Sequence, residues 1–217
     1  MWLRVGVVVI AFFVGSFVLW RRLREEYDGK KILEFWILST ACVAIIGGGI
    51  NWMLYKRAGV WIWGGVGGMI LALWWWCKRQ EWKSWEVIDE MGWSGGWVMA
   101  ILAIGRGAWE RGAVYLAGLV FLKLVSQNYR RWRWYASGKP GLVGLLGMAW
   151  ASGTELAIVN SGNGYLYWGG LGLSQWVGLW VLIASGVVVY LRSGRKTSED
   201  ILDLWQKITL KKLNHRF

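Results

Sequence analysis

Long apolar runs, separated by short segments rich in arginine and lysine, are the feature that most constrains this chain of 217 residues. A run of about 18 or more apolar residues is long enough to cross a hydrocarbon layer of about 30 Å as a helix. Charged residues make up 18% of the chain and hydrophobic residues 56%. This composition is less charged than that of a typical soluble domain. The sequence therefore predicts an all-α, polytopic membrane protein.

The pattern predicts a bundle of seven transmembrane helices in a single domain, residues 1–192, followed by a cytoplasmic amphipathic tail, residues 193–217. The predicted spans are 2–20, 32–55, 59–77, 91–104, 113–125, 141–158 and 171–191. The fourth is short by itself and needs residues from about position 87, or a tilt, to cross the layer. Arginines follow the first run instead of preceding it, which favours a signal-anchor helix over a cleavable signal peptide.

The basic residues predict the orientation of the bundle. Nineteen of the 25 lysines and arginines fall from Arg192 onward and in the loops that the seven spans place on the same side. Such a bias marks the cytoplasmic side. We therefore expect the N-terminus outside and the C-terminus in the cytoplasm. We interpret the net charge of +12 as that of basic loops that orient the helices and contact anionic lipid headgroups, and not as a sign of nucleic-acid binding.

The tail has the pattern of an amphipathic helix. Ser198 can cap it, and Ile201, Leu204, Trp205 and Ile208 recur at helical spacing beside lysines. Such a helix lies on the inner leaflet or docks against the inner loops of the bundle.

The stretch 61–68, Trp-Ile-Trp-Gly-Gly-Val-Gly-Gly, is costly in a soluble helix because glycine loses backbone entropy there. In a membrane helix, small residues spaced as Gly64 and Gly68 let a neighbouring backbone or a lipid chain approach closely. We expect this stretch to open the central helix of the bundle. Its glycines and those at 47–49 are predicted to line a cavity that opens laterally to lipid.

Few polar residues are predicted to lie at membrane depth, where an ionisable group is a functional candidate. They are Asn51, Asp89, Glu90, Arg106, Glu110, Lys123 and Glu155. Several of them can have purely structural roles. Asp89 and Glu90 can lie at the membrane interface, Lys123 can snorkel to it, and Asn51 can form a hydrogen bond between helices. Arg106 ends a helix on the outer side, where it can bind a phosphate or act as an ordinary interfacial residue. It is also the candidate partner for Glu155.

Catalytic and metal-binding signatures are scarce in the sequence. The single histidine lies in the tail and the two cysteines lie in apolar runs, so we expect no metal site and no cofactor. A Ser-His-Asp set and a phosphate-binding Walker loop are missing from the chain as well. The sequence alone leaves the catalytic residues unassigned.

Four segments carry a resemblance to a known family: 45–55 (IIGGGINWMLY), 63–68 (WGGVGG), 105–106 (GR) and 171–176 (LGLSQW). They resemble a glycine-rich second helix, a His-Gly-Gly motif, the start of a Gly-Arg-x-Gly-Asn-Phe signature and the glutamine-containing start of the last helix. These motifs are those of the bacterial prolipoprotein diacylglyceryl transferases. The resemblance implies a seven-helix protein of the bacterial inner membrane in the same orientation. It also implies transfer of diacylglycerol from phosphatidylglycerol to a prolipoprotein cysteine.

The residues that the resemblance nominates for substrate binding are Arg106, Glu155, Asn51, Gly64 and Gly65. The implied partners are phosphatidylglycerol and the signal peptide of a prolipoprotein.

The chain departs from the family pattern at several functional positions. Trp63 stands where the family has histidine, and an indole cannot take a proton from a thiol. Gly49 and Ala151 stand at family arginine positions, and Gly107-Ala108-Trp109 replaces Gly-Asn-Phe.

Three hypotheses about function follow from these matches and departures. The first is a diverged transferase that binds phosphatidylglycerol and, if active, transfers its diacylglyceryl group. The second is a non-catalytic lipid-binding or scaffold protein. The third is a small transporter, which would need polar residues along a path across the bilayer.

Overall fold

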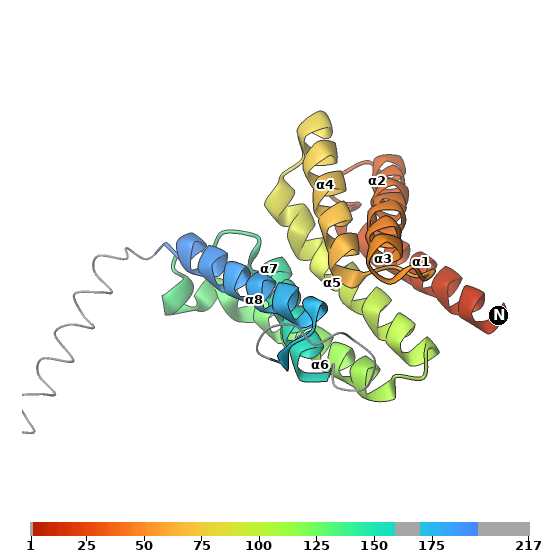
Figure 1. Cartoon of the computed structure of the whole chain (residues 1–217). Coiled ribbons are helices and arrows are strands. Elements are labelled where there is room, and N and C mark those ends of the chain that lie inside the picture. Colours follow the sequence, from red (N-terminus) through yellow and green to blue (C-terminus); the bar gives the residue numbers. More distant parts are fainter. Residues whose placement is uncertain (1, 159–169, 195–217) are drawn as a thin grey trace, which may run out of the picture.

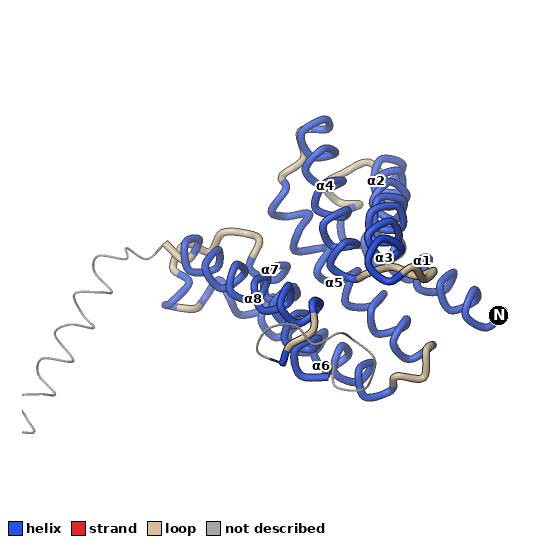
Figure 2. The backbone as a smooth tube through the Cα atoms, in the orientation of Figure 1, coloured by secondary structure: helices blue, strands red, loops and turns tan. Residues whose placement is uncertain are grey.

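The computed structural model describes residues 2–158 and 170–194, and its regular elements are helices (Figure 1). The helices are α1 Trp2–Leu23, α2 Gly29–Cys42, α3 Gly48–Tyr55, α4 Ile62–Gln80, α5 Ser84–Gly105, α6 Trp109–Asn128, α7 Leu142–Ile158 and α8 Leu173–Arg192. A π-helical turn, η1 Val43–Gly47, joins α2 to α3, so that residues 29–55 form one helical rod. Two 3₁₀ turns, η2 Tyr129–Arg131 and η3 Arg133–Tyr135, follow α6. Short loops connect most of these helices (Figure 2).

Within residues 2–158 and 170–194, four helical segments are long and apolar enough to cross a membrane: Val5–Leu23, Gly29–Tyr55, Ser84–Gly105 and Leu173–Arg192. A shorter apolar helix covers Leu142–Ala157. These features support the predicted class, an all-helical membrane protein. The count of seven spans and the orientation stay predictions. The predicted tail helix and residues 159–169, between the last two predicted spans, lie outside the described residues.

The fourth predicted span, 91–104, is too short, because the helix extends back over the charged residues that precede it. Helix α5 begins at Ser84 and runs for 22 residues. Its acidic residues are compensated inside the bundle. Asp89 Oδ2 and Oδ1 accept hydrogen bonds from the backbone N–H groups of Gly141 and Gly144 at 2.7 and 2.8 Å. Glu90 pairs with Arg22 of α1 at 3.0 Å.

The central helix of the bundle is α5, not α4, which the stretch Trp61–Gly68 opens. Helix α5 packs against α1, α6 and α7, whereas α4 packs mainly against α2 and η1. In Figure 1, α1 to α4 lie to one side of α5 and α6 to α8 to the other. The glycines of α4 therefore allow close packing between helices at the periphery of the bundle and not at its centre. Close backbone approach at the centre comes instead from Gly92 of α5, which lies against Gly144 of α7.

Tryptophan side chains fill much of the apolar interior between α1, α2, α4 and α5. Trp76 and Trp82 pack with Phe35, with ring centroids 5.9–6.0 Å apart, and Tyr27 lies 4.4 Å from Trp82. Large aromatic rings bury much apolar surface while leaving few rotatable bonds to fix. Part of the tryptophan excess is thus explained by packing between helices and not by interfacial belts alone.

Candidate functional site

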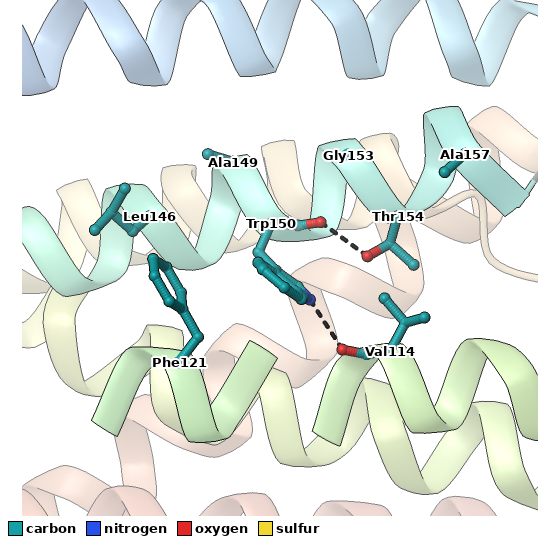
Figure 3. A pocket seen from close by; sticks show the side chains of 8 residues that line it. All are labelled: Val114, Phe121, Leu146, Ala149, Trp150, Gly153, Thr154 and Ala157. Atoms are coloured by element: carbon teal, nitrogen blue, oxygen red, sulfur yellow. Dashed lines mark hydrogen bonds between the residues drawn. The ribbon is translucent and has the colours of Figure 1, made fainter. Parts of the chain in front are cut away.

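An apolar groove of about 390 Å³ lies between α6 and α7 and is open on one side. It is lined by Val114, Phe121, Leu146, Ala149, Trp150, Gly153, Thr154 and Ala157 (Figure 3). Its volume is within the range of small-molecule sites, and nearly all of its exposed lining is apolar. A groove of this composition suits a hydrocarbon chain and not a polar solute.

Trp150 forms the middle of the groove by reaching from α7 to α6 (Figure 3). Its indole Nε1 donates to the Val114 carbonyl oxygen at 3.0 Å, and its ring stacks on Phe121 with centroids 5.5 Å apart. Gly118 of α6 makes room for the indole, because a Cβ there would overlap the Trp150 ring. The hydrogen bond satisfies the one polar atom of the indole, which fixes the ring and keeps the groove wall apolar.

A buried ion pair neighbours the groove in the sequence, although neither of its members is among the groove-lining residues. Glu155 of α7 is 6% exposed, and its Oε1 lies 3.7 Å from Arg111 Nη1 and accepts from the Tyr115 hydroxyl at 3.5 Å. Arg111 stands one helical turn before Val114, and Glu155 directly follows Thr154, so the ion pair adjoins two groove-lining residues. A buried carboxylate is costly without such a partner.

Glu155 pairs with Arg111 instead of Arg106, so the sequence-based pairing was wrong. Helix α6 begins at Trp109, and its first turn turns Arg111 toward α7. Arg106 is exposed and caps the C-terminus of α5. The spacing of Arg111 and Tyr115, four residues apart and hence on one helix face, was the signal that sequence reasoning missed.

Arg106 and Glu155 lie at the same end of the bundle, because a short turn joins Arg106 to the first turn of α6. The other three nominated residues lie elsewhere. Asn51 Nδ2 donates to the Arg57 carbonyl oxygen at 2.8 Å and stabilises the turn after α3.

Gly64 and Gly65 are buried in the contact between α4 and η1. A Cβ on Gly64 would lie 3.1 Å from Gly47 Cα, and a Cβ on Gly65 would lie 3.1 Å from a methyl carbon of Val43. These glycines bring two helices together, so the predicted cavity lined by glycines of the second and third spans is replaced by direct helix packing. The groove described above involves other residues.

Trp63, which the resemblance described above aligns with a histidine, is held by hydrogen bonding. It is 6% exposed, and its Nε1 donates to the Ser174 carbonyl oxygen at 2.7 Å. Trp61 Nε1 donates to the Ser174 hydroxyl at 2.8 Å. The two indoles therefore tie the start of α4 to the first turn of α8, which is a structural role.

The helical fold and its long apolar helices indicate that this chain is a helical membrane protein. A scan of family models and searches of curated proteins and of solved structures found no match. Among the described residues, no group of His, Cys, Asp and Glu is arranged to hold a metal ion.

Proposed function

We propose that this protein binds an anionic phospholipid taken laterally from the bilayer, with an acyl chain in the α6–α7 groove and the phosphate near Arg111 and Arg106. The observations that support this proposal are the open, apolar groove and the Arg111–Glu155 pair, whose members neighbour the groove-lining residues Val114 and Thr154 in the chain. The resemblance described above nominates phosphatidylglycerol as that lipid and a bacterial inner membrane as its location.

Arg111 is suited to a phosphate group for a geometric reason. Its contact with Glu155 is long, at 3.7 Å, and its Nε is buried with no hydrogen-bond partner among the described residues. A guanidinium presents several N–H donors in one plane and binds phosphate through two parallel hydrogen bonds. A lipid phosphate would satisfy donors that Glu155 leaves unused.

We further propose that diacylglyceryl transfer to a prolipoprotein cysteine is slow or absent in this diverged member. The reaction needs a base to form the cysteine thiolate. Trp63 takes the place of the family histidine, and its N–H is engaged with Ser174. The protein then acts as a lipid-binding membrane protein, with the signal peptide of a prolipoprotein as a second proposed partner.

Filling the groove tests the lipid-binding proposal. Gly153 lines the groove and a Cβ there would meet nothing within 4 Å, so Gly153→Leu should occupy the space without clashing with the fold. Gly67→Leu is the matched control, because Gly67 is also a half-buried glycine within a helix with open space at its Cβ. Copurified lipid is quantified by mass spectrometry. We expect phosphatidylglycerol with the wild type and Gly67→Leu, and much less with Gly153→Leu. Equal lipid in all three would refute the groove as the site.

An assay with a lipobox peptide and phosphatidylglycerol tests the catalytic half. We expect no turnover, together with lipid binding that weakens in Arg106→Ala and Arg111→Ala. Turnover that is lost in Arg106→Ala would establish an enzyme instead. Robust turnover that survives Arg106→Ala would contradict both the lipid site and the assignment of a non-catalytic role.

A further inference from the structure

A second surface lies at the opposite end of α6 from Arg111 and combines exposed cations with stacked indoles. It consists of residues 129–139, here named the basic segment, which links α6 to α7. Arg130, Arg131, Arg133 and Lys139 are all exposed, and the sequence contains no Asp or Glu between Arg111 and Glu155. The cations of this segment therefore have no acidic neighbours along the chain; in space, Asp89 and Glu86 of α5 act electrostatically on Arg130.

The aromatic residues give the basic segment a fixed shape. Trp132 and Trp134 stack with centroids 5.4 Å apart, and Trp134 is 39% exposed. Tyr135 is fully buried, and its hydroxyl donates to the Lys139 carbonyl oxygen at 3.0 Å. Tyr129 packs edge-on against Tyr135. The segment is thus folded on its own aromatic core and presents its arginines from two 3₁₀ turns.

Three helices hold the basic segment in place. From α8, Arg192 Nη2 donates to the Pro140 carbonyl oxygen at 2.6 Å, and the Ser193 carbonyl that follows the helix accepts from Ser137 N–H at 3.1 Å. The Arg192 guanidinium lies 3.9 Å from the Trp85 ring centre on α5. The Asp89 carboxylate holds the backbone of Gly141 and Gly144 at the start of α7. A site that is ordered before binding loses less entropy on binding.

The location of the basic segment identifies its ligand class. Helix α5 contacts both the start of α7, which follows the basic segment, and the end of α1, where Arg22 pairs with Glu90. The basic segment therefore lies at the same cation-rich end of the bundle as the end of α1. Tryptophan is enriched at the level of lipid headgroups, and arginine binds phosphate. We infer that the basic segment is a preformed binding site for anionic phospholipid headgroups of the leaflet at which α6 ends. The site is separate from the α6–α7 groove.

Lipid binding to full-length protein tests this inference. Native mass spectrometry of the delipidated protein, with added phosphatidylglycerol, cardiolipin or phosphatidylcholine, compares the wild type with Arg130→Gln/Arg131→Gln/Arg133→Gln. The control Arg24→Gln/Lys30→Gln/Lys31→Gln removes the same charge from the exposed α1–α2 region. Gly153→Leu blocks the groove and isolates binding at the basic segment.

We expect the triple arginine variant to bind anionic lipid roughly tenfold or more weakly, since each basic residue near an anionic surface adds to affinity. The control should change by less than about a third of that, and phosphatidylcholine should bind weakly throughout. A matched Arg→Lys triple variant, which keeps the charge, serves as a check that the segment still folds and should retain most of the affinity. Loss of affinity in the control as large as in the arginine variant would overturn the inference. An oligonucleotide that displaces the lipid from bilayer-embedded protein would overturn it as well, in favour of a nucleic-acid partner.

Discussion

At the scale of single residues, the buried Asp89 carboxylate links helices that lie far apart in the sequence. It lies on α5 and accepts hydrogen bonds from two backbone N–H groups at the beginning of α7, as an N-cap side chain does within one helix. A buried carboxylate so satisfied stabilises the fold, and its removal would leave two N–H groups without an acceptor. The residue is a positioning element for α7 and hence for the groove.

Replacing Asp89 tests that role. Asp89→Ala should lower the free energy of unfolding by roughly 1–3 kcal/mol, the cost of leaving buried donors unpaired. Asp89→Asn keeps one acceptor oxygen and should cost less. Thermal unfolding in detergent measures both, with Asp28→Ala, the exposed N-cap of α2, as the comparison. An Asp89→Ala protein as stable as the wild type would contradict the proposed capping role.

The pH dependence of stability is predicted to depend on Glu26, in the turn between α1 and α2. A side-chain hydrogen bond with Glu86 is the largest cause that raises the pKa of Glu26 above its ordinary value of 4.5. A raised carboxyl pKa means stability that is fully present below pH of about 4.5 and is lost as the pH rises through the folded pKa. Glu26→Gln keeps a donor toward Glu86 at every pH. Its melting temperature should therefore gain on that of the wild type as the pH rises above 4.5.

The control for this effect is Glu34→Gln, an exposed carboxyl-to-amide change on α2. It shows how far a carboxyl-to-amide change away from Glu86 alters the melting temperature over the same pH range. A Glu26→Gln protein whose offset from the wild type follows that of Glu34→Gln would argue against the shared hydrogen bond.

At the scale of elements, α4 and the α2–η1 rod are held at a distance that only glycine allows. A Cβ on Gly68 would lie 2.6 Å from the Cys42 carbonyl oxygen, and backbone cannot move aside as a flexible side chain can. The π-helical turn η1 lies directly beside this contact. The close approach compensates for the low helix propensity of the glycines through van der Waals contact between backbones.

Neighbouring glycines of α4 offer a sharp test of that packing. Gly68→Ala should destabilise the protein by about 1–3 kcal/mol through overpacking. Gly67→Ala faces open space and should be neutral or stabilising by up to about 1 kcal/mol, because alanine is the better helix former. Unfolding in detergent distinguishes them. Similar effects of the two substitutions would mean that α4 does not pack as closely as described.

At the scale of the whole molecule, the orientation of the bundle can be tested independently of its ligands. The distribution of basic residues predicts that Arg57 lies outside and Lys139 inside. In a background without Cys42 and Cys77, single cysteines at these two exposed positions should react with a membrane-impermeant reagent from opposite sides. Labelling from the same side would refute the seven-span arrangement.

The sequence by itself determined the class of this protein and the order of its helices. Apolar runs must form helices in a bilayer, since no water is present to satisfy backbone groups, and so their length alone predicts them. The pattern also marked Glu155 and Arg106 as unusual, because ionisable groups in or near the membrane are rare.

Tertiary structure alone decided which of these residues act together. The start of α5 could not be predicted from the charged residues Asp89 and Glu90, because the partners of these residues are remote in sequence. The partners are two backbone N–H groups at the start of α7 and Arg22 of α1. Remote contacts also explain why Glu155 pairs with Arg111 and not with the predicted Arg106. For the same reason the groove lies between α6 and α7 and not along the glycines of α4. Burial of a charge or of a glycine depends on which helix faces it, and helix faces are chosen by packing over the whole bundle.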